Sequence, residues 1–258
     1  MSDEQDMRRM GGLKTMIPVT YMFMWIGTFA LMGVGLPIPG LSIGLAGFYS
    51  KDIVLEAAFG AHSLSGTFAF WAGIAAALMT AFYSCRLMFL TFHGKPRCDE
   101  RTLAHVHESP KVMLLPLAVL VLGSLFAGAI GYGVFVGDGM EEFWGDSLLV
   151  LEGHESIEAA HHVPYWVKVL PLVMAVAGFV LALMMYITSP AMADAWARAL
   201  RPLYLLSYNK WYFDEIYDRL FVRPAFVIGR GLWKSGDGAI IDGVGPDGLA
   251  EATQGLSL

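Results

Sequence analysis

The sequence predicts an all-α fold, in which a polytopic bundle of membrane-spanning helices precedes a long amphipathic helix. Hydrophobic residues make up 56% of the 258 residues, charged residues only 16%, and the mean hydropathy is +0.55. Soluble domains carry about a quarter charged residues, so this composition indicates a lipid environment. Four long stretches contain no Asp, Glu, Lys or Arg, namely residues 15–50, 57–85, 112–137 and 169–193.

Residues 1–16 are predicted to form a loop that leads into the first span. Arg8, Arg9 and Lys14 precede an apolar run, which superficially resembles a secretory signal. However, acidic residues come before them, and no small-residue cleavage site follows the run. A loop is therefore the better interpretation.

The first uncharged stretch, residues 15–50, is predicted to contain a break. As one continuous helix it would be about 54 Å long, which is too long for one span and too short for two complete ones. We place helices at 17–36 and 41–61, with Lys51 near the middle of the second. The residues that interrupt the apolar pattern between them are Gly35, Pro37, Pro39 and Gly40.

Two structures are compatible with this break. One is a tight turn between two spans, since glycine and proline favour turns. The other is a discontinuous helix at membrane depth, which is tolerated only where protein or a water-filled cavity surrounds the free backbone groups. The residues alone leave both open.

The remaining uncharged stretches hold one span each, at 66–92, 112–134 and 166–188. Each of these contains the roughly 20 apolar residues that a helix needs to cross a bilayer. The predicted bundle therefore covers residues 17–188 and has about five spans, one of them broken.

The distribution of charges predicts the orientation of the bundle. If the chain starts outside, residues 93–111 and the C-terminal segment lie inside, and residues 135–167 lie outside. The inner loop is basic and the outer loop has no Lys or Arg, which follows the positive-inside rule. The three basic residues before the first span oppose this orientation. The inner loop contains Lys95, Arg97, Arg101 and Lys111, and the outer loop contains Asp138, Glu141, Glu142, Asp146, Glu152, Glu155 and Glu158.

Residues 189–258 are predicted to form a lateral amphipathic segment, because charges interrupt every apolar run. Apolar residues recur there at helical spacing, at Phe213, Tyr217, Leu220 and Phe221, and Asp214, Asp218 and Arg219 lie on other faces. Such a helix lies along a membrane surface. The net charge of −6 argues against nucleic acid as a partner, because phosphate binding needs a basic face.

Lys51 is the residue that most clearly indicates a function. An ionisable side chain inside a span costs about 2.5–3.5 kcal/mol on insertion scales, so it usually faces the bundle interior and marks an ion path. A buried lysine near a carboxylate can change between charged and neutral forms, as a proton relay requires. The alternative is a lysine at a helix end that reaches the interface. Asp52 and Glu56 cannot face the same way as Lys51, so we expect their partners on other helices.

Arg86 lies near the cytoplasmic end of the span at 66–92. Its charge could compensate an acidic group in the bundle, which would add it to a proton path with Lys51 and Asp52. It could also reach the nearby interface with its long side chain.

No metal site and no redox centre are predicted. Cys85 and Cys98 are too few and too far apart for a cluster or a disulfide framework, so we expect free thiols. Several histidines lie in polar loops without a recognised ligand set, namely His105, His107, His154, His161 and His162. His62 and His93, at span ends, could serve as entries to a proton path.

A seven-residue motif surrounds the central lysine: residues 46–52 have the sequence AGFYSKD. This motif resembles the signature in the broken helix of the antiporter-like subunit L family of bacterial NADH-quinone oxidoreductase, the counterpart of mitochondrial subunit 5. Other similar segments are residues 4–12, 86–94, 108–110 and 212–224. The similarity covers essentially the whole chain, and the combination of the lysine segment with the tail is its most specific feature.

The resemblance implies roles for individual residues. It makes Lys51 the buried lysine of the distal half-channel and Asp52 its neighbouring carboxylate. It makes residues 189–258 the helix that runs along the membrane arm. Within that helix, it places Asp214 and Asp218 in a segment that couples subunits. Where the family often has an acidic residue after the aspartate, this sequence has isoleucine.

The resemblance also implies an assembly. The chain would be a proton-translocating subunit of respiratory complex I in the bacterial inner membrane, in contact with lipid and with other membrane-arm subunits. NADH, FMN, iron–sulfur clusters and quinone would be bound by partner subunits and no cofactor by this chain. Two alternatives remain open, which are the large subunit of a multisubunit cation/proton antiporter and a structural membrane scaffold.

Length is the main departure from the family. Its members carry an N-terminal bundle with its own lysine and glutamate sites, and a final transmembrane helix, which these 258 residues lack. We therefore expect a C-terminal fragment in which Met1 is an internal methionine. We also expect that the fragment alone cannot complete a proton path.

Overall fold

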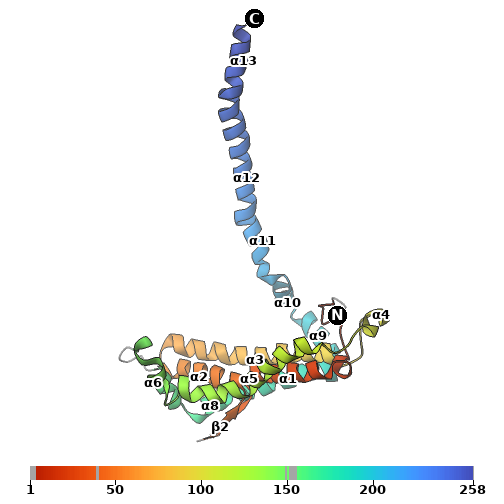
Figure 1. Cartoon of the computed structure of the whole chain (residues 1–258), viewed down its shortest axis with the longest axis vertical. Coiled ribbons are helices and arrows are strands. Elements are labelled where there is room, and N and C mark those ends of the chain that lie inside the picture. Colours follow the sequence, from red (N-terminus) through yellow and green to blue (C-terminus); the bar gives the residue numbers. More distant parts are fainter. Residues whose placement is uncertain (1–3, 39–40, 149, 151–155, 258) are drawn as a thin grey trace. The chain divides into compact units, whose positions relative to one another are not determined.

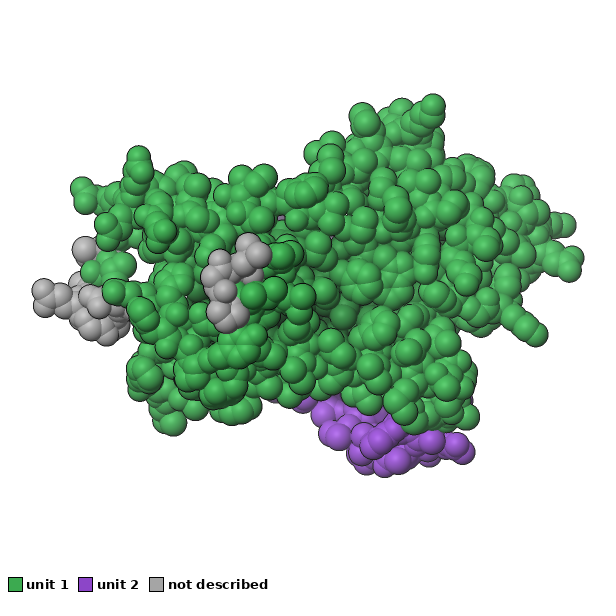
Figure 2. All heavy atoms as spheres, turned by 90° about the horizontal axis from the view of Figure 1, so that it is seen from below, with its two compact units in different colours: residues 1–193 green, residues 194–258 purple. Residues whose placement is uncertain are grey.

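The computed structural model describes residues 4–38, 41–148, 150 and 156–257. The chain divides into two compact units, residues 1–193 and 194–258, which Figure 2 colours separately. Both units are helical, and a two-stranded hairpin is the only sheet within the described ranges. The predicted all-α fold is thereby confirmed.

Helix α1 is shorter than predicted and leads into the hairpin. It spans Pro18–Met32, the strands span Gly35–Ile38 (β1) and Leu41–Gly44 (β2), and α2 follows at Ala46–Gly60. The strands are antiparallel, with Leu36 opposite Ile43. The predicted helices at 17–36 and 41–61 therefore extended too far into the break. Pro39 and Gly40 lie outside the described residues.

Within the described ranges, three helices of the first unit are long and apolar enough to cross a membrane. Figure 1 labels them α3, α5 and α8. They are α3 at Leu64–Phe92, α5 at Lys111–Phe135 and α8 at Tyr165–Leu183, which continues in a π-helical turn at Met184–Thr188. They coincide closely with the predicted spans. Short elements connect them: 3₁₀ turns at Leu13–Thr15 and Gly145–Ser147, and helices α4 at Glu100–Ala104, α6 at Met140–Trp144 and α7 at Ser156–His161.

Helices α1 and α2 lie head to tail along α3 (Figure 1). Three buried clusters mark their course, in antiparallel order along α3: Ile17 with Phe92, Met32 with Cys85, and Leu55 with Phe70. The two helices have 15 residues each and α3 has 29, so together they are about as long as α3 alone. They are the two halves of one discontinuous helix. The first two predicted spans, 17–36 and 41–61, are thus arranged as one interrupted helix along α3, which is the broken-helix alternative of the sequence analysis.

The loop before α1 and the loop after α3 lie at the same end of the bundle. The amide of Gly12 donates to the carbonyl of His93 at 3.1 Å, and the guanidinium of Arg97 donates to the carbonyl of Arg8 at 2.9 Å. A five-span bundle would have placed these loops on opposite sides. With the break inside one span, the basic residues of both loops share a side, so the N-terminal exception to the positive-inside rule disappears.

Glu108 fixes the start of α1 from this second loop. Its carboxylate accepts a hydrogen bond from the amide of Val19 at 2.8 Å and one from the hydroxyl of Thr20 at 2.6 Å. The first amides of a helix have no partner inside it, so an acceptor there stabilises the helix. The interaction joins α1 to a residue close to the start of α5.

The second unit is a long helix with changes of winding. The junction with the first unit contains α9 at Ala191–Ala199, and the elements that follow are α10 at Arg201–Tyr208, a 3₁₀ turn at Lys210–Tyr212, α11 at Phe213–Tyr217, a π-helical turn at Asp218–Val222, α12 at Arg223–Gly231, a π-helical segment at Leu232–Asp242 and α13 at Pro246–Leu256. Positive φ angles at Lys210, Trp211 and Tyr212 bend the helix before α11.

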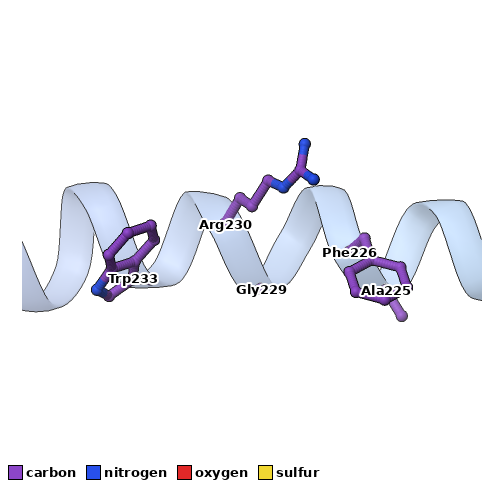
Figure 3. A pocket seen from close by; sticks show the side chains of 5 residues that line it. All are labelled: Ala225, Phe226, Gly229, Arg230 and Trp233. Carbon is purple, nitrogen blue, oxygen red and sulfur yellow. The ribbon is translucent and has the colours of Figure 1, made fainter.

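The apolar side chains of this long helix are exposed. Phe226, Arg230 and Trp233, at helical positions i, i+4 and i+7, line one surface pocket, which Figure 3 shows from close by. An amphipathic helix without a covered apolar face is typical of a segment that meets lipid or another protein.

Candidate functional site

The side chain of Lys51 reaches across the break between α1 and α2. Its ammonium donates a hydrogen bond of 2.6 Å to the carbonyl oxygen of Met32, the last residue of α1. The last carbonyls of a helix have no partner inside it and form the negative end of the helix dipole. A cation is therefore stabilised at this point, although it lies within an apolar bundle.

The sequence predicted Lys51 near the middle of a helix. In the structure, it lies in the second turn of α2. The reason is that α2 starts only at Ala46, after the hairpin. The start of a helix is its positive end, which disfavours a lysine. The half-buried side chain extends instead toward the opposite pole, at the end of α1.

Two glycines allow this close approach. Gly33 ends α1 with a φ of 74°, and a Cβ there would lie 3.0 Å from Cε and 3.1 Å from Nζ of Lys51. Any side chain at Gly47 would collide with the carbonyl oxygen of Ala30. The backbones of α1 and α2 therefore meet directly where the lysine crosses between them.

Asp52 is buried beside the lysine without a polar partner. It is 4% exposed, and neither carboxylate oxygen has a hydrogen-bond partner among the described residues. A buried polar group without a partner costs free energy, and such groups are commonly associated with function. Asp52 is thus placed where a proton, a water molecule or a conformational change would satisfy it.

Glu56 has its partner on another helix, as expected. Its carboxylate lies 3.8 Å from Nζ of Lys168, which belongs to the first turn of α8. The same ammonium donates to the carbonyl of His161, at the end of α7, at 3.2 Å. The sequence analysis missed Lys168. The available signal was its position: Lys168 lies inside the span predicted at 166–188, directly before the uncharged stretch 169–193.

The chain is similar in sequence to a family of known proteins. Residues 1–80 match a family described as "NADH:quinone oxidoreductase/Mrp antiporter, TM". The chain is 40% identical to NADH-quinone oxidoreductase subunit L of Rhodobacter capsulatus, over 94% of this chain and 42% of the relative. The chain belongs to the subunit L family of NADH-quinone oxidoreductases.

Two further members of the subunit L family show the same extent of similarity. Subunit L of Rickettsia conorii is 38% identical over 99% of this chain and 39% of its own length. NADH-ubiquinone oxidoreductase chain 5 of Marchantia polymorpha is 35% identical over 97% of this chain and 37% of its own length. The chain therefore spans about two fifths of the length of the curated relatives that it matches.

Arg86, the third predicted site residue in this family member, lies apart from the carboxylates. Its guanidinium carbon is 5.7 Å from the centre of the Tyr186 ring, and its buried Nε has no hydrogen-bond partner among the described residues. No ion pair within the described ranges includes it. The expected acidic partner is thus not found there, and a cation–π contact takes its place.

The histidines within the described ranges lie at the ends of the bundle. Nε2 of His93 is 3.1 Å from the hydroxyl of Tyr21, and burial, together with the charge of Lys14, lowers the pKa of His93. His62 is exposed before α3, and His154 lies outside the described residues. Among the described residues, no group of three His, Cys, Asp or Glu side chains could hold a metal ion. Cys85 and Cys98 are free thiols, as predicted.

Asp214 and Asp218 lie in the second unit and form ion pairs there. Asp214 is 3.4 Å from Lys210, and Asp218 is 2.7 Å from Arg223. Their carboxylates are well exposed, so these ion pairs contribute little stability by themselves.

Proposed function

We propose that this chain translocates protons across the bacterial inner membrane as a membrane-arm subunit of NADH-quinone oxidoreductase, with Lys51 as its central ionisable group. The observation that carries the proposal is the bond from the Lys51 ammonium to Met32 at the break of a discontinuous helix. Electron transfer, with NADH, FMN, iron–sulfur clusters and quinone, takes place in partner subunits.

Two observations support the proposal: the Lys51 ammonium is held by the carbonyl of Met32, and the neighbouring Asp52 carboxylate is buried with no hydrogen-bond partner among the described residues. A charge in an apolar bundle is costly, so small changes in its surroundings change its protonation. If α1 and α2 move apart at the break, the ammonium loses its acceptor at Met32. The carboxylate of Asp52 belongs to the next residue but points in another direction around α2, so we propose that it receives the proton through water.

The relatives favour this function over the antiporter alternative. The matched family description names both NADH:quinone oxidoreductase and Mrp antiporter, but it covers only residues 1–80. The relatives that cover nearly the whole chain carry oxidoreductase names. We further propose that residues 189–258 form the lateral helix along the membrane arm and that Asp214 and Asp218 contribute to coupling between subunits. We also propose that Arg86 belongs to the proton path, and this rests on its position in the bundle.

The test is Lys51→Ala in the complete enzyme, measured in inverted membrane vesicles. We expect the complex to assemble and to oxidise NADH, and to pump fewer protons per electron. Lys111→Ala is the matched control, because Lys111 is exposed at the start of α5. An unchanged proton-to-electron ratio in Lys51→Ala would contradict the proposal. Sodium-dependent formation of a pH gradient would favour the antiporter instead.

A further inference from the structure

Polar groups continue from Asp52 toward the end of the bundle that carries α7. The side chain of Glu56, four residues further along the same face of α2, is 12% exposed. The side chain of Lys168 is 27% exposed, and His161, which accepts its hydrogen bond, is exposed. Polar residues from α2, α8 and α7 thus form a series whose exposure increases from the interior to the surface.

The ion pair of Glu56 and Lys168 is weakly held. The 3.8 Å between the two charged atoms is longer than a hydrogen bond, and the ammonium donates to His161 instead. Lys168 lies in the first turn of α8, the positive end of that helix, and Glu56 lies one residue before the last turn of α2, near its negative end. The dipole of α8 therefore disfavours the positive charge of Lys168, and the dipole of α2 disfavours the negative charge of Glu56.

A structural role alone does not require these charges. Apolar residues of similar volume commonly stabilise a protein as well as a buried ion pair does. The pair does, however, give the chain a carboxylate one helical turn beyond Asp52, and a cation that can keep its bond to His161 when that carboxylate becomes neutral.

We propose that Glu56 and Lys168 form the outer limb of the proton path, which connects Asp52 to the surface at His161. This inference rests on the proposed function. In one direction of transfer, an O–H bond of the protonated Asp52 breaks and an O–H bond forms on the Glu56 carboxylate, directly or through one water molecule. Asp52 gains the negative charge that Glu56 loses. Glu56 then gives the proton to a surface water molecule, becomes a carboxylate and pairs again with Lys168. Transfer in the other direction uses the same bonds in reverse.

The test compares Glu56→Gln with the native residue in the complete enzyme. Glutamine keeps the size of the side chain and cannot carry the proton, so we expect assembly and NADH oxidation to continue while proton pumping slows by roughly an order of magnitude or more. Glu158→Gln is the matched control, since Glu158 is an exposed acid on α7. Normal pumping by Glu56→Gln would overturn the inference.

A second variant separates relay from structure. In the double variant Glu56→Gln with Lys168→Gln, two amides can hydrogen-bond in place of the ion pair. A purely structural pair would then be replaced and pumping would be normal, which would overturn the inference. Pumping that stays low in an assembled complex supports it. If Glu56→Gln fails to assemble, the double variant and Glu56→Asp test the relay instead. Glu56→Asp keeps the carboxylate on a shorter side chain, and we expect it to pump slowly. Normal pumping by Glu56→Asp would count against the relay.

Lys51→Ala, measured in parallel, distinguishes the two proposals. Reduced pumping in Lys51→Ala together with normal pumping in Glu56→Gln would refute the role of Glu56 and Lys168 and leave the proposed function of the chain intact. Normal pumping in both variants would remove the proposed function as well.

Discussion

The ammonium of Lys51 and the carbonyl oxygen of Met32 join the two halves of a discontinuous helix through one hydrogen bond of 2.6 Å. The bond comes from a side chain of α2 and ends on the last residue of α1. Hydrogen bonds from charged groups are about twice as strong as neutral ones. Loss of the proton from Lys51 would therefore weaken the contact between α1 and α2, so protonation and the geometry of the break are coupled.

Lys51→Gln separates this contact from proton transfer. The glutamine amide can donate to the carbonyl of Met32, but it does not titrate. We expect the variant to assemble better than Lys51→Ala and to pump as poorly. Native gel electrophoresis gives the yield of complex, and vesicle acidification gives the pumping. Equal yields of the two variants would show that the bond to Met32 does not hold the break together.

Gly47→Ala tests the close approach of α1 and α2. A methyl group at Gly47 would collide with the carbonyl oxygen of Ala30, so the helices must separate. Overpacking of this kind typically costs about 1–3 kcal/mol. We expect a lower midpoint of thermal inactivation and impaired pumping. Gly27→Ala, in α1, is the control, since a Cβ there meets nothing within 4 Å. A normal midpoint for Gly47→Ala would contradict the observed packing.

Glu108 makes the start of α1 sensitive to acid. Burial by itself would raise the pKa of Glu108, but hydrogen bonds from Thr20, Val19 and Ser109 outweigh this effect and hold the pKa below its usual range. A lowered pKa means that the stabilisation is fully present above the ordinary glutamate pKa of about 4.3, and is lost as the pH falls through the lowered value.

We therefore expect Glu108→Ala to destabilise the protein by about 1 kcal/mol near neutral pH, as for other helix caps. The difference from the native protein should shrink as the pH falls below about 4.3. Thermal inactivation measured from neutral to acidic pH checks this. Glu100→Ala, an exposed residue of α4, is the control. A destabilisation by Glu108→Ala that does not change with pH would argue against the carboxylate as the cap.

The long helix of the second unit is expected to dock through its apolar side. Removing the chain from about residue 190 should weaken assembly of the enzyme or the coupling of pumping to electron transfer. Within the helix, Phe226→Ser and Trp233→Ser should reduce the yield of complex, because each removes an exposed apolar side chain. An intact complex with normal pumping after the truncation would refute the proposed lateral role.

Sequence alone determined the parts of this protein that depend on local composition. Uncharged runs of sufficient length located α3, α5 and α8, because a helix in lipid must be apolar over about 20 residues. The cluster of glycine and proline located the break, and the cost of a charge inside an apolar span singled out Lys51. The motif around it also indicated the family, which the relatives confirm.

Only the tertiary structure decided how the pieces combine. Hydropathy measures the length of an apolar run, but it cannot distinguish two complete spans from two half-helices that lie head to tail along α3. It therefore placed the N-terminal loop on the wrong side of the bundle. The partners of Lys51 and Glu56 come from α1 and α8, which are distant in sequence, so no spacing rule could pair them. The physical reason is that a buried charge is satisfied by whichever groups the packing brings near it.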